Sequence, residues 1–168
     1  DDDRTYVGDA QPDLTFGWQN NFTWKNWDFS FFFRGTIGNK VLNNPRAAYA
    51  NNTYLIGTNA LDDELTYTMK ESSRVCSYYL ENGSFIRLDN LALGYTFDTK
   101  KINWLDKARL YFAAQNLFVI TGYKGLDPEV ELFRGESSDT DAGLSPGIEP
   151  RQFFPKARTF TLGVNLTF

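Results

Sequence analysis

The last eleven residues of the chain read RTFTLGVNLTF (158–168), and apolar and polar side chains alternate through them from residue 159 onward. One side of an extended chain would carry Phe160, Leu162, Val164, Leu166 and Phe168, and the other would carry only threonine, glycine and asparagine. Successive side chains of a β-strand point to opposite faces, so the pattern predicts a strand with one apolar face and one small polar face.

Four earlier segments repeat this alternation, near residues 13–24, 27–37, 85–97 and 108–118. In the third of them the second half is the better defined, and the signal in the fourth is weaker. Asp, Glu, Lys and Arg are absent from residues 14–24, 29–33, 110–118 and 159–168, which we interpret as charges confined to the connections. The sequence therefore predicts an all-β chain of five strands, the fifth near 158–168.

The composition of the polar face favours one class of sheet. The exposed face of a soluble β-sandwich usually carries Lys and Glu, whereas here it carries Thr, Asn, Gln, Gly and Ser. Bulky apolar residues facing outward and small polar residues facing inward are typical of outer-membrane barrels, and about eleven tilted residues span the hydrocarbon band. Trp24, Trp27 and Trp104 lie beside the short turns, where an interfacial aromatic girdle belongs. A soluble antiparallel sandwich remains the alternative.

The connections alternate in length, which is typical of a barrel with short periplasmic turns and long extracellular loops. The short ones are residues 25–26 and 98–107, and the long ones are residues 38–84 and 119–157. Five transmembrane strands cannot close a barrel, and open edges are not tolerated in lipid. We therefore expect the chain to be part of a larger barrel.

Composition excludes several other classes of function. The 168 residues include no His and a single cysteine, Cys76, which removes His-based catalysis, His metal ligands and any internal disulfide. A net charge of −4 argues against nucleic acid as a partner. No run of 18 apolar residues and no leader-like start is present. We expect no catalytic residue, no cofactor and no metal, and hence no enzyme.

Three weaker candidates remain in the long connections. The stretch DTDAG (139–143) superficially resembles a calcium loop but lacks the rest of its spacing, and the acidic residues of LDDE (61–64) rarely converge on one ligand. A solvated acidic loop is the better interpretation of both. Tyr78 and Tyr79 either stack on sugar rings or cap the strand that follows, and the sequence leaves both possibilities open.

Four blocks resemble, in the same order, blocks of the SusC/RagA family of TonB-dependent transporters. They are DRTYVGDAQPD (3–13), GSFIRLDNLALGYTF (83–97), QNLFVITGYKGLDPE (115–129) and FPKARTFTLGVNLTF (154–168). The departures are mild: Asp9-Ala10 stands where Asn-Pro is common, and Leu126 where Tyr is common. The last block also resembles the C-terminal assembly signal of outer-membrane proteins, carried here by the ladder from Phe160 to Phe168.

This resemblance implies a fold and a function. Residues 1–168 would be the last five antiparallel strands of a 22-stranded barrel in the outer membrane of Bacteroidetes, with the plug domain absent from this chain. Such transporters import nutrients, either oligosaccharides or peptides, with a SusD-like surface lipoprotein, and TonB–ExbB–ExbD acts through the missing N-terminal part. The substrate-binding residues stay unknown. The alternatives are a soluble all-β glycan-binding module and a passive porin.

Overall fold

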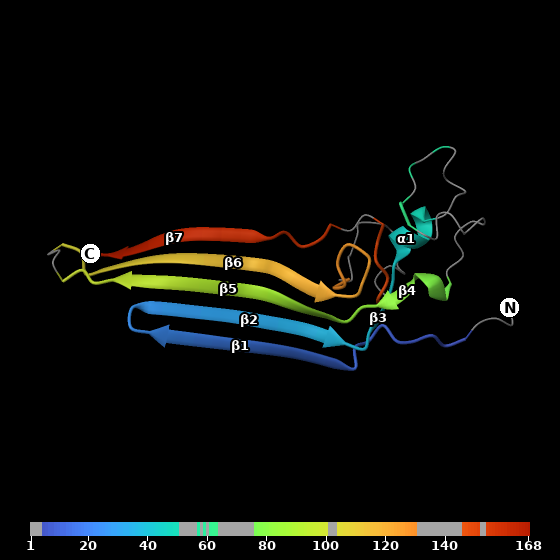
Figure 1. The fold of residues 1–168 in the computed structure, drawn as a ribbon, viewed down its shortest axis with the longest axis horizontal. Helices are drawn as coiled ribbons and strands as arrows, with labels where there is room; N and C mark the ends of the chain where they lie inside the picture. Colours follow the sequence, from blue (N-terminus) through green and yellow to red (C-terminus); the bar gives the residue numbers. More distant parts are fainter. Residues whose placement is uncertain are drawn as a thin grey trace. The chain divides into compact units, whose positions relative to one another are not determined.

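A computed structural model describes residues 5–50, 57, 59, 61–63, 76–100, 104–130, 146–151 and 154–168. Its elements in chain order are β1 (Leu14–Trp24), β2 (Trp27–Ile37), β3 (Lys40–Leu42), α1 (Asn44–Tyr49), the 3-10 helix η2 (Ser77–Tyr79), β4 (Leu80–Asn82), β5 (Phe85–Phe97), β6 (Lys107–Thr121) and β7 (Thr159–Thr167) (Figure 1). No helix in this part of the chain is long and apolar enough to cross a bilayer.

Five long strands form one antiparallel sheet in the order β1-β2-β5-β6-β7, so strands that follow one another along the sheet also follow in sequence (Figure 1). Between β6 and β7 the register runs from Lys107 opposite Thr167 to Gln115 opposite Thr159. These strands are the five alternating segments of the sequence, and the predicted all-β class is confirmed. Strand β6 continues to Thr121, three residues past the predicted segment.

The chain divides into two compact units. The sheet unit contains Thr15–Gly35, Phe85–Ile120 and Lys156–Phe168. The loop unit contains the described residues of Asp1–Leu14, Thr36–Ser84 and Thr121–Pro155.

One face of the sheet unit is a layer of contacting aromatic rings. Trp18 of β1 lies edge-on to Phe31 of β2 at 5.2 Å between ring centroids, and Phe33 meets Phe118 of β6 at 6.2 Å. Trp18 is 58% exposed and Phe118 is 37% exposed, while Phe31 and Phe33 are half-buried. A continuous exposed apolar face of this kind marks a surface that another apolar medium covers.

The opposite face carries charged residues inside the strands, so the interpretation that charges are confined to the connections is wrong. Asp28 and Arg34 lie in β2, Asp89 in β5 and Arg109 in β6. Arg34 pairs with Asp89 at 3.2 Å, and Arg109 pairs with Asp28 at 2.5 Å. Charges are tolerated inside these strands because they neutralise one another on the polar face.

The pair between Asp28 and Arg109 reaches over an intervening strand. Its members lie in β2 and β6, and β5 runs between those two strands. Gly94 of β5 makes this crossing possible, because a Cβ there would meet the guanidinium of Arg109 and the carboxylate of Asp28. The glycine is therefore required by the close approach of two side chains above it.

We expect Gly94→Val to destabilise the protein by about 1–3 kcal/mol, because the new side chain forces the ion pair apart. The measurement is thermal unfolding of the purified full-length protein. Ala92→Val is the matched control, because it adds bulk to the same strand face without lying under an ion pair. Equal stability of the two variants would contradict this role for Gly94.

The alternation of β5 changes phase once along the strand. Asp89 lies on the charged face because it pairs with Arg34, and Gly94 lies on the same face beneath Asp28 and Arg109. An odd-numbered and an even-numbered residue cannot share a face of one regular strand. This change of phase explains why only the second half of the segment showed clear alternation in the sequence.

Candidate functional site in the folded loop unit

The loop unit has a core of its own. Buried side chains include Val41, Ala47, Ala48, Tyr79 and Tyr123. The sequence analysis treated residues 38–84 as one connection, whereas the structure places β3, α1, η2 and β4 within it. Strands of three residues are too short to show a period of two, so the pattern could not reveal them.

Local interactions at its N-terminus define where helix α1 begins. The Asn43 side chain accepts a hydrogen bond from the Arg46 N–H at 2.9 Å, and Pro45 occupies the first turn. Asparagine is a preferred N-cap, and proline at the start of a helix costs no hydrogen bond. The helix then buries Ala47 and Ala48.

Main-chain bonds join the two long connections within this unit. The Leu42 N–H donates to the Gly147 carbonyl at 2.7 Å, and the Glu149 N–H donates to the Leu42 carbonyl at 3.0 Å. A segment of the second connection thus lies along β3, and Leu42 and Ile148 form a parallel bridge. The two connections fold together as one body.

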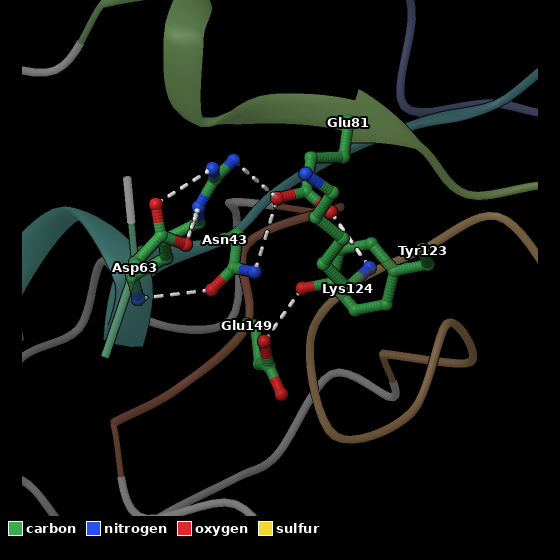
Figure 2. Close-up of polar contacts among 7 residues, drawn as sticks. Asn43, Asp63, Glu81, Tyr123, Lys124 and Glu149 are labelled. Atoms are coloured by element: carbon green, nitrogen blue, oxygen red, sulfur yellow. Dashed lines mark hydrogen bonds and ion pairs between the residues drawn. The ribbon is translucent and has the colours of Figure 1, made fainter. Parts of the chain in front are cut away.

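Arg46 is the centre of a charged network in the loop unit, and its partners Asp63 and Glu81 are labelled in Figure 2. Its guanidinium donates twice to Asp63, at 2.7 and 3.0 Å, and once to Glu81 at 3.0 Å. The hydrogen bond to Asp63 raises the pKa of Arg46 above its ordinary value. Glu81 also accepts from the Asn43 side chain at 3.3 Å and from the Lys124 N–H at 2.8 Å. The network therefore links both connections.

Glu149 is a fully buried carboxylate with two donors from the segment 121–130. The Tyr123 hydroxyl donates to it at 2.5 Å (Figure 2), and the Leu126 N–H donates to it at 3.0 Å. Burial, and then the hydrogen bond to Glu149, raise the pKa of Tyr123 above its ordinary value, so the phenol stays protonated as a donor. Glu149 fixes the turn 123–126.

We expect Glu149→Gln to destabilise the loop unit by about 1–3 kcal/mol. The neutral amide replaces a charged acceptor, so it weakens the hydrogen bond from the Leu126 N–H, and its NH2 group must turn toward one of the two former donors. Hydrogen exchange of the Leu126 amide in the full-length protein would measure the loss. Lys124→Ala is the control, because only the main chain of Lys124 is bonded to Glu81. Unchanged protection in Glu149→Gln would refute the assigned role.

The two neighbouring tyrosines, Tyr78 and Tyr79, differ in burial. Tyr79 is fully buried, whereas Tyr78 is 67% exposed. Both belong to η2, immediately before β4. Tyr79 is thus a packing residue of the loop unit, and only Tyr78 presents its ring at the surface.

The acidic candidates do not form a described metal site. Asp63 is bound to Arg46, and Glu64 lies outside the described residues, as does the stretch 139–143. Among the residues that the structure describes, no cluster of metal-ligating side chains occurs.

The apolar ladder at the end of the chain lies along one face of β7. Its five members are between 49% and 74% exposed: Phe160, Leu162, Val164, Leu166 and Phe168. Phe168 stacks on Trp104 with 5.8 Å between ring centroids. The assembly role of this ladder stays a prediction.

Sequence reasoning missed the residues that hold the loop unit together. Arg46, Glu81 and Glu149 are far apart in the chain and belong to no motif with a fixed spacing. One sequence signal was available, the stretch YKGLDPE (123–129), whose Gly, Asp and Pro are typical of a turn. This stretch contains Tyr123 and Leu126, the two donors to Glu149.

Comparisons with known proteins give one consistent result. No family model matches the sequence. TonB-dependent receptor P3 of Formosa agariphila is 34% identical over 99% of this chain. TonB-dependent receptor SusC of Bacteroides thetaiotaomicron is 31% identical over 93% of it. The chain spans only 17% and 15% of the lengths of these two relatives.

Solved structures agree with these relatives. The RagAB peptide importer in its closed-closed state superimposes with a TM-score of 0.72 and 26% sequence identity. That match covers 95% of this chain and 18% of the RagAB chain. The similarity thus includes both the five-stranded sheet and the sequence blocks. The chain therefore belongs to the TonB-dependent receptor family and is a β-barrel segment of the SusC/RagA type.

Proposed function

We propose that this chain is the C-terminal part of the barrel wall of an outer-membrane nutrient transporter. The observation that carries the proposal is the pair of contrasting sheet faces, one of exposed aromatic rings and one of ion pairs, in a chain related to SusC over nearly its whole length. The aromatic face would contact lipid, and the charged face would line the lumen. A soluble glycan-binding module would have to leave the aromatic face in water, which the hydrophobic effect opposes.

The proposed topology places the loop unit outside the cell. If Phe168 lies at the periplasmic rim, β7 runs inward, and residues 38–84 and 119–157 are extracellular. Residues 25–26 and 98–107 are then periplasmic. This arrangement is supported by the lengths of the connections, since barrels of this kind have short periplasmic turns and longer extracellular loops.

We expect a membrane-impermeant thiol reagent on intact cells to label Tyr78→Cys and Leu126→Cys, but not Lys100→Cys. The first two side chains are 67% and 57% exposed, and the side chain of Lys100 is 89% exposed, so access within the protein is not limiting. The background is Cys76→Ser in the full-length receptor, and labelling after cell lysis shows that Lys100→Cys reacts. Labelling of Lys100→Cys on intact cells would overturn the topology.

Substrates and partners are part of the same proposal. The receptor would import oligosaccharides or peptides together with a SusD-like lipoprotein seated on the extracellular side. RagAB is described as a peptide importer, which makes peptides one of the two substrate classes to test. TonB–ExbB–ExbD would act through a plug domain, and no step requires catalysis. Co-purification of a SusD-like lipoprotein with the tagged receptor would support this pairing, and a receptor that transports without it would refute it.

A further inference from the structure

Asn116 of β6 has a backbone conformation that most residues avoid. Its φ is +52°, in the left-handed region, where asparagine is one of the few tolerated residues. In this conformation its side-chain amide donates to the Lys156 carbonyl at 2.6 Å and to the Ala157 carbonyl at 3.3 Å. The amide oxygen in turn accepts a hydrogen bond from Arg87 of β5.

These contacts begin where the antiparallel pairing of β6 with β7 ends. The last opposed pair is Gln115 and Thr159, and Asn116 is the next residue of β6. Its side chain therefore binds the main chain just before β7, beyond the last opposed pair. Arg87 is only 1% exposed and lies over the Phe85 ring at 5.5 Å, so the group that holds Asn116 is itself fixed.

The side-chain pattern of β7 leaves its register poorly defined. A slip by one residue would exchange the two faces, but a slip by two keeps every apolar residue on the apolar face. Threonines stand at 159, 161 and 167, and apolar residues at every even position from 160 to 168, so the slipped strand looks similar. Gly163, whose missing Cβ leaves room for the Tyr111 ring, and the stacking of Phe168 on Trp104 favour the native register, but the alternation of the two faces is the same in the slipped ones.

We propose that Arg87 and Asn116 form a clamp that sets the register of β7 on β6. The clamp binds the consecutive carbonyls of Lys156 and Ala157, which lie just before Thr159 in the chain. A slip of β7 by two residues would carry these carbonyls about 7 Å away from Asn116. Arg87 is a positioning residue, because it acts only by orienting the amide. This role is independent of what the receptor transports.

Disulfide trapping in the full-length receptor tests the clamp. Ala113→Cys with Thr161→Cys reports the native register, in which these residues are opposite each other. Ala113→Cys with Thr159→Cys reports a slip of two residues, because in the native register this diagonal pair is about 7–8 Å apart and beyond disulfide reach. Gln115→Cys with Thr161→Cys reports the slip in the other direction.

We expect Asn116→Asp to lower the ratio of native to slipped disulfide several-fold. Aspartate tolerates the left-handed backbone and can accept from Arg87, but it has no N–H to offer the two carbonyls. Asn116→Gly keeps the backbone conformation and removes the whole side chain, so it provides a second test if Asn116→Asp inserts poorly. Asn90→Ala, on the neighbouring strand, is the control and should not change the ratio.

Only receptor molecules extracted from the outer membrane are counted, so a lower yield does not alter the ratio. A native ratio in both Asn116 variants would refute the clamp. If the Asn116 variants keep the native disulfide ratio and still transport, the clamp is refuted but the proposed transport function is not. The register is measured by the disulfides, and the function is measured by transport.

Discussion

Replacing Leu162 by arginine in the full-length receptor is expected to destabilise the barrel by about 2–4 kcal/mol. Leu162 is 74% exposed on the apolar face of β7, opposite Phe112 of β6. If that face contacts lipid, the arginine side chain enters the hydrocarbon region, where a guanidinium loses its hydration. Unfolding of the purified receptor in denaturant, in lipid vesicles, measures the effect.

Thr161→Arg is the matched control, one residue away on the other face. Thr161 is opposite Ala113, and the neighbouring pair Tyr111 and Gly163 lies on the same face as Arg109. An arginine there enters the polar lumen and should cost much less. Leu93→Arg and Ala92→Arg repeat the comparison on β5. Equal tolerance within both pairs would contradict the assignment of the faces.

Deleting Phe168 is expected to lower the amount of receptor in the outer membrane strongly while changing its final stability little. The side chain is 73% exposed and its ring stacks on Trp104, so its removal loses a partial stacking interaction at a rim. If the ladder from Phe160 to Phe168 is the assembly signal, insertion depends on it before the barrel closes.

Quantitative blotting of outer-membrane fractions measures the level, and heat resistance on semi-native gels reports the stability of the inserted molecules. Phe168→Asp should match the deletion, and Phe154→Ala, which removes an exposed aromatic outside β7, should leave the level unchanged. Normal levels of the deletion variant would remove the assembly role.

The five strands were predictable from the sequence because one face of each is continuously apolar. In RTFTLGVNLTF (158–168) no residue contradicts the period of two, and the structure makes β7 of Thr159–Thr167. In β5 the change of phase between Asp89 and Gly94 weakened the same signal. The charges within the strands were misjudged, because Asp28 and Arg109 are partners across the sheet and are 81 residues apart in sequence.

The interior of the loop unit was not predictable in the same way. Its strands β3 and β4 are three residues long, and its helix α1 has six residues, so neither shows a recognisable periodicity. Glu149 is buried only because Tyr123 and Leu126 donate to it, and their convergence depends on the folded path of two connections. A buried carboxylate and a solvated one look alike in a sequence.

The proposed barrel wall requires that the alternating faces of this sheet meet lipid on one side and the lumen on the other. A nitroxide label placed in turn along β7 of the reconstituted, otherwise cysteine-free receptor tests it directly. Oxygen concentrates in the bilayer and a polar nickel chelate concentrates in water. We predict high oxygen collision rates at Phe160, Leu162 and Val164 and low ones at Thr161 and Asn165. Equal rates at all five positions, or the opposite alternation, would contradict the account.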